Sequence, residues 1–437
     1  MNKSDAATAP ALAIMVGGGP APGINSVIAS ATIEAINCGL RVIGACDGFR
    51  WLAEGDTRKT IPLKIEDVSR IHLTGGSILR TSRTNPARDE ATLDRTVGAL
   101  RALGIRYLIC IGGDDTTYAA AKIAERCAGS IGIVTVPKTI DNDLPLPENA
   151  STFGFQTARA VGTGIVESLM EDARTTNRWY VAVSMGRKSG ALALGMCKAA
   201  GATLAVIPEE FGPGPLDLNL VVDTIVGSVI KREVHGHNNG VAVVAEGIAE
   251  SLDPSALSGF KASERDPYGH LRLADTALGL LLRNRVMAAL RELGVKVTVV
   301  AKDIGYELRC AKPIPFDVDY TRTLGYGAVR YLLGGGSGAL VAITGGRVTP
   351  VSLNELLDPK TGRVRIRMVN VAAESYKVAR SYMIRLEPRD LEEPMLSSLA
   401  MQTKLTPQAF KERFLPSVTA DPAAAVRDGP PPVRAKP

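Results

Sequence analysis

The chain has 437 residues, of which 45% are hydrophobic, and its formal net charge is +6. This length is sufficient for a substantial core divided between two or three domains. The charge is modest and no long run of Lys or Arg carries it, which argues against nucleic-acid binding and suits small anionic substrates. No hydrophobic stretch reaches the roughly 18 to 20 residues that span a bilayer, and residues 1–10 lack a signal-peptide core. We therefore expect a cytoplasmic protein without membrane contact.

Short runs of hydrophobic and β-branched residues recur along the chain, and most are continuous rather than alternating. Continuous runs are typical of strands that helices bury on both faces. The predicted strands lie at residues 12–16, 41–45, 107–111, 131–136, 179–184, 203–207, 241–245, 295–300 and 339–343. Helical spacing between them, as in residues 24–39, 118–128 and 274–293, predicts repeated β-α-β units and an α/β fold.

About nine strands are more than one compact sheet usually carries, so we predict two doubly wound, Rossmann-like domains with the active site in the cleft between them. Their predicted extents are residues 11–155 with about 307–345 for the first domain and residues 156–306 with about 346–385 for the second. Residues 386–415 are predicted to form a C-terminal helical extension. Residues 1–10 and 416–437 are small, polar or rich in Pro and Ala, which predicts disorder.

A Gly-rich turn follows the first predicted strand, where residues 17–25 read GGGPAPGIN before a hydrophobic helix. Main-chain N–H groups and a helix dipole at such a turn can face an anion. The segment matches neither GxxxxGK[ST] nor GxGxxG, so taken alone it is equally well explained as a tight turn without a ligand.

Two adjacent carboxylates, Asp114 and Asp115, follow the strand at residues 107–111 in the segment GGDDTT. The carboxyl end of a strand is where α/β sheets bind ligands, and Asp oxygens are suited to Mg²⁺. The alternative is a helix N-cap, because Asp and Thr commonly cap helices. Both can hold, with one residue capping the helix and the other binding the metal.

The segment PKTIDND at residues 137–143 places a cation, a hydroxyl and two carboxylates directly after a buried strand. Phosphoryl transfer needs a carboxylate that accepts the proton of the attacking hydroxyl and a positive group that neutralises charge on the phosphoryl oxygens. Lys138, Thr139, Asp141 and Asp143 supply these groups. A solvated polar loop is the alternative.

Three further segments carry weaker signals. Arg187 and Lys188 in MGRKSG follow a strand and are either a phosphate clamp or part of a surface loop. Glu246 in VVAEG offers an acceptor for sugar hydroxyls, and Arg309 in GYELR offers a donor for phosphate.

Taken in order, GGGPAPGIN, GGDDT, PKTIDND, MGR, AEG and GYELR resemble the phosphofructokinase family from about residue 12 to residue 384. The resemblance implies Mg²⁺-dependent phosphorylation of the 1-hydroxyl of fructose 6-phosphate, a step of glycolysis and gluconeogenesis. It implies that Asp141 is the general base and that Asp114 holds Mg²⁺. The residues it places in catalysis are Asp141, Lys138, Asp115, Thr139, Asp143 and Arg187.

The resemblance also assigns binding residues for both substrates. At the donor phosphates it places Gly18, Gly113, Asp114, Asp115 and Lys138, with Arg83 also against them. At the sugar phosphate it places Thr139, Ile140, Asp141, Arg178, Met185, Gly186, Arg187, Glu246, Tyr306, Glu307, Leu308 and Arg309. Arg178 resembles an arginine that such enzymes contribute across a subunit interface, which implies a homodimer or homotetramer.

The phosphoryl donor is predicted from two departures from the ATP-using pattern. Asp115 stands where those relatives have the second glycine of GGDG, and its volume and charge oppose the α-phosphate of ATP. Lys138 stands where many have glycine and adds a cation for pyrophosphate. We therefore expect reversible transfer from pyrophosphate to fructose 6-phosphate, giving fructose 1,6-bisphosphate and phosphate. The alternatives are ATP as donor, sedoheptulose 7-phosphate as an additional acceptor, and a catalytically silent subunit. The last alternative is disfavoured by the joint presence of Asp141, Asp114, Lys138 and Arg187.

Overall fold

The computed structural model describes residues 10–253 and 277–422, which form two compact units. The first unit consists of residues 10–161 and 306–367. The second consists of residues 162–253, 277–305 and 368–422, and the division between the units falls inside helix α7 (Phe155–Thr176). Within the described ranges, no helix is both long enough and apolar enough to cross a membrane.

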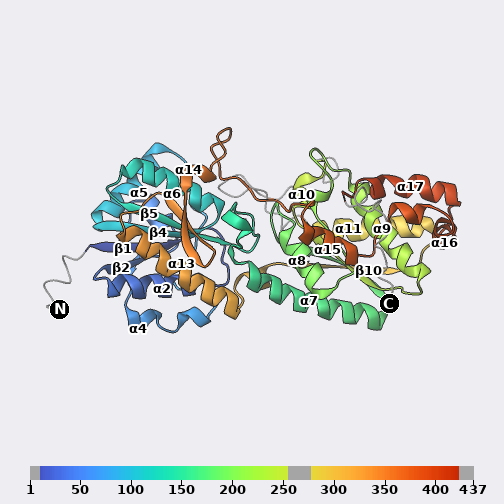
Figure 1. Ribbon diagram of the computed structural model, residues 1–437, viewed down its shortest axis with the longest axis horizontal. Coiled ribbons are helices and arrows are strands. Elements are labelled where there is room, and N and C mark those ends of the chain that lie inside the picture. The colour runs from blue at the N-terminus through green and yellow to red at the C-terminus, as the bar shows by residue number, and fades with distance from the viewer. Residues whose placement is uncertain (1–9, 254–276, 423–437) are drawn as a thin grey trace, which may run out of the picture. The chain divides into compact units, whose positions relative to one another are not determined.

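The first unit is built on a mixed sheet whose central strands are parallel (Figure 1). Its strand order is β12-β11-β5-β4-β1-β2-β3, and β6 pairs with β5 beside this path. The parallel strands are β1 (Ala11–Val16), β2 (Arg41–Ala45), β4 (Ile105–Gly112), β5 (Gly132–Thr139), β6 (Phe153–Gly154) and β11 (Ala339–Thr344). The two edge strands, β3 (Thr60–Pro62) and β12 (Arg347–Ser352), are antiparallel to their neighbours.

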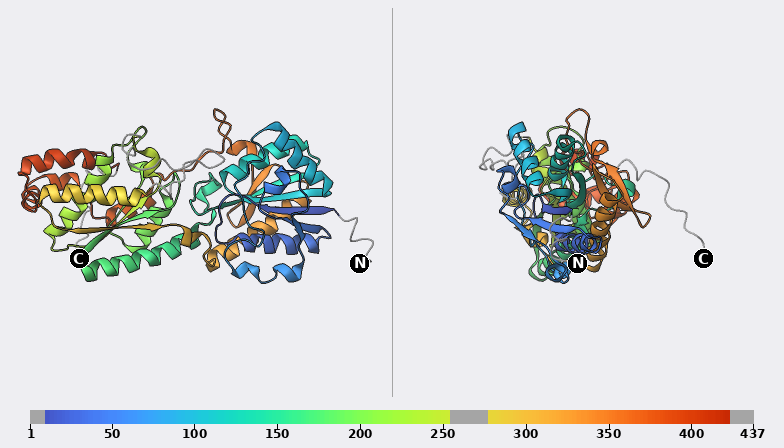
Figure 2. Two further views of the ribbon diagram at one scale, coloured as in Figure 1. Left: turned by 180° about the vertical axis from the view of Figure 1, so that it is seen from behind. Right: turned by 90° about the vertical axis from the view of Figure 1, so that its left-hand side faces the viewer.

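Helices cover both faces of this sheet, as Figures 1 and 2 show. The longer ones are α2 (Ile24–Asn37), α5 (Glu90–Ala102), α6 (Asp114–Cys127) and α13 (Pro315–Leu333). The shorter ones are α3 (Arg50–Ala53), α4 (Ile65–Val68), α12 (Tyr306–Arg309), α14 (Leu353–Leu356), η1 (Ile71–Leu73) and η2 (Pro147–Asn149).

Strand β1 shows why its sequence is hydrophobic throughout. Its side chains alternate, so that Ala13 and Met15 pack with α5 and α6, whereas Ile14 and Val16 pack with α2 and α13. All six residues of β1 are buried. A strand with helices on both faces has no polar side to display, which is the pattern that the sequence predicts.

The second unit has a four-stranded sheet, all parallel, in the order β10-β7-β9-β8. The strands are β7 (Arg178–Ser184), β8 (Leu204–Val206), β9 (Gly240–Ala245) and β10 (Thr298–Ile304). Its helices are α8 (Ala191–Ala200), η3 (Pro208–Glu210), α9 (Leu218–Val234), α10 (Ile248–Ser251), α11 (Leu278–Leu293) and α15 (Glu374–Tyr382). The predicted α/β class and the Rossmann-like character of both units are confirmed.

The predicted C-terminal helical extension is also confirmed. It consists of η6 (Pro388–Leu391), α16 (Met395–Met401) and α17 (Pro407–Thr419), and α17 packs against α9. The predicted disorder is wrong for residues 416–422, because α17 continues to Thr419 and Asp421 is buried. Residues 1–9 and 423–437, for which disorder is also predicted, lie outside the described residues.

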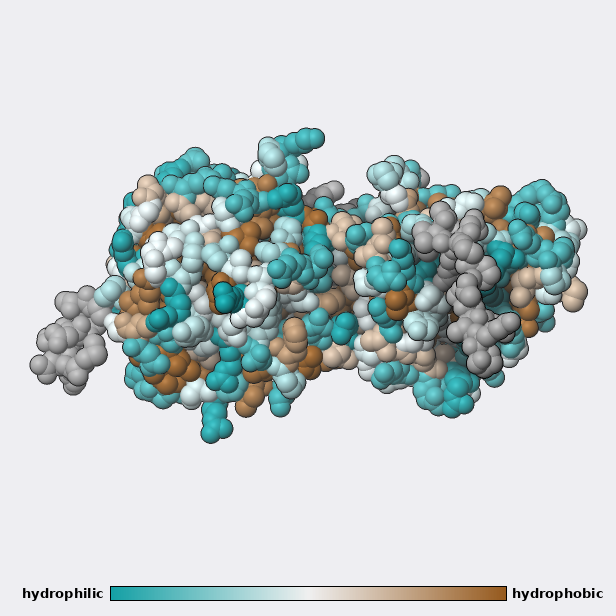
Figure 3. Space-filling model, viewed as in Figure 1, coloured by the Kyte–Doolittle hydropathy of each residue, from teal (hydrophilic) through white to brown (hydrophobic). Residues whose placement is uncertain are grey.

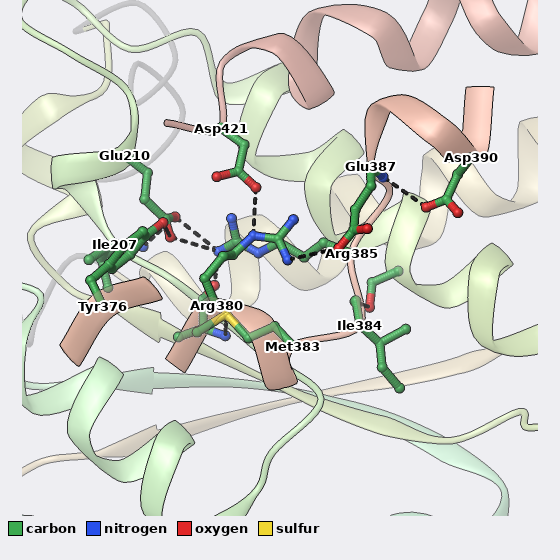
Figure 4. A network of polar contacts seen from close by, with 12 residues as sticks. Ile207, Glu210, Tyr376, Arg380, Met383, Ile384, Arg385, Glu387, Asp390 and Asp421 are labelled. Carbon is green, nitrogen blue, oxygen red and sulfur yellow. Dashed lines mark hydrogen bonds and ion pairs between the residues drawn. The ribbon is translucent and has the colours of Figure 1, made fainter. Parts of the chain in front are cut away.

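A buried polar network links residues 376–385, η3 and Asp421 within the second unit (Figure 4). Arg385 donates to Glu210 Oε2 at 2.9 Å, and the Tyr376 hydroxyl donates to Glu210 Oε1 at 2.7 Å. Arg380 Nε donates to Asp421 Oδ2 at 2.6 Å. Because these buried charges are paired, the chain after α15 is fixed to the unit by ionic contacts as well as by hydrophobic packing.

One predicted boundary needs correction. The sequence predicts that residues from about 346 join the second domain, but residues 346–367 belong to the first unit. The reason is that β12 turns back and pairs along its whole length with β11. Its burial pattern is only intermediate or exposed, so its sequence lacks the hydrophobic run by which the other strands are recognised.

On the face in Figure 3, hydrophilic residues predominate and hydrophobic ones form small separate patches. Among the described residues, the large hydrophobic side chains that are most exposed are Met401 at 79% and Tyr382 at 78%. Single exposed side chains of this kind are normal in globular proteins.

Candidate active site

The candidate site of the first unit lies at the carboxyl ends of β1 and β4. These strands are parallel neighbours, and the connection after β1 leads to β2 on the opposite side of β1 from β4. Ligands bind at such a switch point in open α/β sheets. Backbone hydrogen bonds fix the turn after β1, because Gly17 donates to Ile111 at 2.9 Å and Gly18 donates to Ser82 at 2.9 Å.

Two cationic side chains reach the Gly-rich turn. A Cβ atom on Gly18, where φ is +79°, would lie 3.0 Å from Lys138 Nζ, and a Cβ atom on Gly19 would overlap the Arg309 guanidinium. Side chains at these two positions would therefore displace the cations. The glycines allow positive charge to approach the backbone closely, which is the requirement of an anion site.

The N-terminus of α6 faces the same region. Gly113 is its N-cap, and Asp114 and Asp115 form the first turn. Neither Asp is therefore the N-cap residue, which answers one of the alternatives left open by the sequence. Carboxylates in the first turn interact favourably with the helix dipole. Helix formation thus tolerates two adjacent charges at this position.

Lys138 lies at the centre of the charged residues. Its side chain is almost fully buried, and Nζ donates to the carbonyl oxygen of Gly19 at 2.6 Å. Burial lowers the pKa of Lys138 to about 7. Neighbouring charges act on this pKa in the decreasing order Arg309, which lowers it, Asp141, which raises it, Arg83, which lowers it, and Asp114, which raises it. The amine therefore shares its surroundings with two other cations and with both predicted functional carboxylates.

The loop after β5 is buried, so it is not the solvated loop that the sequence allowed as an alternative. Asp141 is 7% exposed and Asp143 is 5% exposed. The hydroxyl oxygen of Thr139 accepts the Asp141 backbone N–H at 3.0 Å, and the hydroxyl of Thr152 donates to the Thr139 carbonyl at 2.8 Å. Thr139 thus shapes the turn on which Asp141 stands.

Arg367 also contacts this loop, although its sequence gives no sign of such a contact. Its backbone N–H donates to the carbonyl oxygen of Asp143 at 2.7 Å, and its Nε donates to that of Asn142 at 3.0 Å. Arg367 stands in the arginine-rich segment RVRIRM, far from the loop in sequence. No local signal distinguishes it from Arg363 or Arg365.

The predicted residues of α12 differ in exposure. Tyr306 is 64% exposed, and its ring centroid lies 5.7 Å from the Arg309 guanidinium. Leu308 is fully buried, and Ile140 is 4% exposed. The side chains of Leu308 and Ile140 thus lie in the core, and their predicted place at the sugar phosphate stays a prediction. Glu307 is exposed on the same short helix.

In the second unit, four of the predicted residues, Met185, Gly186, Arg187 and Glu246, lie at the carboxyl ends of β7 and β9, which are parallel neighbours. Glu246 Oε1 accepts the backbone N–H groups of Gly186 at 3.0 Å and Arg187 at 2.8 Å, and Glu246 is 6% exposed. Arg187 adopts a left-handed backbone with φ of 49°. Glu246 thus fixes the turn after Met185, in addition to its predicted contact with the sugar.

Arg178 lies at the start of β7, at the opposite end of the strand from Met185. Its Nε is 3.7 Å from Asp172 Oδ2, and its side chain is about one third exposed. The Tyr180 hydroxyl donates to the same carboxylate oxygen at 2.5 Å. The partly exposed guanidinium agrees with the predicted contribution to a neighbouring subunit, which stays a prediction.

The carboxylates near Lys138 suit a magnesium ion that is held only partly by protein ligands. In the part of the chain that the structure describes, no group of three or more His, Cys, Asp or Glu residues is arranged to hold a metal. Mg²⁺ at phosphoryl-transfer sites usually keeps several waters and is held by one or two carboxylates together with substrate phosphates. Asp114, with Asp141 also close to Lys138, supplies such a partial ligand set.

A comparison with models of known protein families shows to which family the chain belongs. A family model described as phosphofructokinase matches residues 11–332. The chain belongs to the phosphofructokinase family. This confirms the family that the joint motif pattern indicates, and the match includes both the Gly-rich turn and the loop that carries Asp141.

Two curated relatives are similar to nearly the whole chain. One is the pyrophosphate–fructose 6-phosphate 1-phosphotransferase of Thermotoga maritima, which is 56% identical over 409 residues, covering 92% of this chain and 97% of the relative. The other is the Naegleria fowleri protein of the same name, which is 45% identical and covers 93% of this chain and 95% of the relative. An ATP-dependent 6-phosphofructokinase of Streptomyces coelicolor is 32% identical, covering 79% of this chain and 94% of the relative.

Solved structures support the fold. The phosphofructokinase of Saccharomyces cerevisiae aligns with a TM-score of 0.64 at 21% identity, covering 94% of this chain and 50% of that one. A pyrophosphate-dependent phosphofructokinase of Marinobacter aquaeolei aligns with a TM-score of 0.62 at 18% identity, covering 94% of this chain and 91% of that one.

Proposed function

We propose that this phosphofructokinase transfers a phosphoryl group reversibly from pyrophosphate to the 1-hydroxyl of fructose 6-phosphate. The observation that carries the proposal is the buried amine of Lys138, which lies over the Gly-rich turn and near Asp114 and Asp141. It puts a cation, a backbone anion site and two carboxylates in one place. The two relatives that match over most of the chain are named for the same reaction.

In the proposed step, the oxygen of the sugar 1-hydroxyl attacks the terminal phosphorus of pyrophosphate. The bond from that phosphorus to the bridging oxygen breaks, and inorganic phosphate leaves. Asp141 accepts the hydroxyl proton, with Thr139 holding its backbone. Lys138 neutralises charge on the transferred and leaving phosphates, as phosphoryl transfer requires. The same role for Arg187 of the second unit stays a prediction from the sequence.

We propose Mg²⁺ as the cofactor, held by Asp114 with the donor phosphates. When bound, the ion supplies neutralisation of the negative charge on the phosphoryl oxygens. The N-terminus of α6 supports this assignment, because its backbone N–H groups follow the carboxyl end of β4, and Lys138 lies at the carboxyl end of the neighbouring strand β5.

Asp115 is proposed to select the short donor. It stands beside Asp114 in the first turn of α6. A nucleotide would bring an additional phosphate toward this turn, and a fixed carboxylate there repels it electrostatically and sterically. Pyrophosphate carries no further phosphate beyond the two that the Gly-rich turn and Lys138 bind.

The second unit is proposed to bind the sugar phosphate. Its candidate residues are Arg178, Met185, Gly186, Arg187 and Glu246. For Thr139, Tyr306, Glu307 and Arg309 of the first unit, a contact with the sugar phosphate stays a prediction from the sequence. We propose a homodimer or homotetramer, in which Arg178 is contributed to a neighbouring subunit. A cytoplasmic location remains a prediction from the sequence.

Reversal of the reaction tests the proposed function. Fructose 1,6-bisphosphate, inorganic phosphate and Mg²⁺ are incubated with the enzyme, and the products are followed by ³¹P NMR. We expect a pyrophosphate signal that grows together with fructose 6-phosphate and is absent with the Asp141→Ser variant. Failure of the wild-type enzyme to form pyrophosphate at any enzyme concentration would contradict the proposal.

A further inference from the structure

Arg367 donates four hydrogen bonds to the segment that follows Asp141 and contains Asp143. In addition to its backbone bond with Asp143 and its Nε bond with Asn142, Nη1 donates to the carbonyl oxygen of Ala150 at 2.9 Å. Nη2 also donates to the side-chain oxygen of Asn142. The planar guanidinium thus bridges both ends of the segment from residue 142 to residue 150, with a geometry that only Arg provides.

The bonds converge on a strained residue. Asn142 has φ of 56°, a left-handed conformation that costs free energy in a residue other than glycine. Such a conformation persists only where its surroundings enforce it. The side-chain oxygen of Asn142 accepts from the Thr152 backbone at 3.1 Å and from Arg367, and its carbonyl oxygen accepts from Arg367. Arg367 therefore supplies two of the bonds that hold the turn between Asp141 and Asp143.

The positive charge of Arg367 lies near two ionisable groups. Asp143 and the phenol of Tyr320 from α13 are the ionisable groups whose charges interact with it. The Tyr320 hydroxyl is buried and has no hydrogen-bond partner among the residues that the structure describes. Arg367 is partly buried, so a change to an apolar side chain would leave carbonyl oxygens of the loop without donors at a place that water reaches poorly.

We propose that Arg367 is a positioning residue, which acts by holding the turn at Asn142 and thereby fixes the directions of the Asp141 and Asp143 carboxylates. This inference rests on the proposed function, in which Asp141 is the base. Arg367 does not need to touch either substrate. Its effect should therefore fall on turnover and leave substrate affinity nearly unchanged, because a base that is displaced by about 1 Å can cost roughly 100-fold in rate.

Arg365 offers a matched control. It lies two residues earlier, is exposed, and its guanidinium donates to the backbone carbonyl of Glu355, away from the catalytic loop. Both arginines thus bond to backbone carbonyls of the same unit. Only Arg367 bonds to the loop.

The experiment compares Arg367→Ala, Arg367→Lys and Arg365→Ala with the wild type, using pyrophosphate, fructose 6-phosphate and Mg²⁺. For Arg367→Ala we expect kcat to fall roughly 100-fold with KM changed less than about threefold, and added guanidinium ion at millimolar concentration to restore part of kcat. Arg367→Lys should fall between this variant and the wild type, and Arg365→Ala should keep wild-type kcat. Circular dichroism determines the folded fraction to which kcat is referred.

Unchanged kcat in folded Arg367→Ala would overturn the inference. A fall in kcat that added guanidinium does not reverse, and that Arg365→Ala shows as well, would also overturn it. If Arg367→Ala does not fold, Arg367→Lys decides: a folded enzyme with wild-type kcat overturns the proposal, and a lowered kcat at unchanged KM supports it. An inactive wild-type enzyme would instead contradict the proposed function, so the two failures are distinguishable.

Discussion

The buried amine of Lys138 predicts that pyrophosphate binding depends on pH in a specific way. In the free protein, burial and neighbouring cations lower its pKa from 10.5 to about 7. Two negatively charged phosphates beside Nζ favour the charged amine, so binding should raise this pKa. Above pH 7, the Lys138 amine therefore takes up a proton when pyrophosphate binds. The affinity for pyrophosphate falls as the pH rises, because the proton concentration falls.

The magnitude follows from the fraction of protonated amine in the free protein. With a pKa of about 7, this fraction is about 90% at pH 6, about 10% at pH 8 and about 1% at pH 9. If the bound enzyme keeps the amine protonated, affinity should fall about tenfold between pH 6 and pH 8 and about tenfold again between pH 8 and pH 9.

Isothermal titration calorimetry of pyrophosphate with Mg²⁺, in the wild type and in Lys138→Met, measures this dependence. Pyrophosphate itself titrates in the same range, but its protonation affects both proteins equally and cancels in the ratio of their dissociation constants. Titrations in buffers of different ionisation enthalpy count the proton directly. A ratio that stays constant from pH 6 to pH 9 would refute the reasoning, since it would mean that the Lys138 amine takes up no proton when pyrophosphate binds.

Three further predictions concern single residues. Asp141→Ser should lower kcat by roughly 100- to 10,000-fold while calorimetry still detects fructose 6-phosphate binding, and wild-type turnover would remove Asp141 as the base. Asp115→Gly should raise kcat/KM for ATP by about 10- to 100-fold. The reason is that a unit charge about 5 Å from a phosphate, at an effective dielectric constant of about 20, opposes binding by about 3 kcal/mol before solvent screening. If the ratio of kcat/KM for ATP to kcat/KM for pyrophosphate is unchanged in steady-state assays, this prediction is contradicted. Glu210→Ala should lower the free energy of unfolding in urea by about 3 to 5 kcal/mol, because it leaves the buried Arg385 unpaired, whereas the exposed pair broken by Glu374→Ala should cost about 0 to 1 kcal/mol. Equal losses in the two variants would show that the buried pair has no special weight.

The sequence predicts the central strands of both sheets because helices bury them on both faces. Strand β1, with every residue buried, is the clearest case. Strands β3 and β12 are missed because each lies at a sheet edge, where one neighbour and partial exposure leave no continuous hydrophobic run. The Lys138 loop is predicted because its functional residues are contiguous in the chain.

Residues that meet the site through tertiary structure are harder to predict. Arg367 resembles the exposed Arg365 in sequence, and only the folded chain brings it to Asn142. The second role of Glu246, as acceptor for two backbone N–H groups, is likewise invisible from the segment VVAEG. Sequence motifs identify groups that carry charge, whereas the contacts that aim those groups depend on packing.

Donor choice is the central claim, and a comparison of initial velocities tests it most directly. Purified enzyme is assayed with fructose 6-phosphate and Mg²⁺, using pyrophosphate or ATP at matched concentrations, and fructose 1,6-bisphosphate is quantified. We predict saturable formation of the bisphosphate with pyrophosphate and at least tenfold lower kcat/KM with ATP, the lower end of the penalty assigned to Asp115. Equal or higher kcat/KM with ATP would contradict the assignment of Asp115 and Lys138 to pyrophosphate.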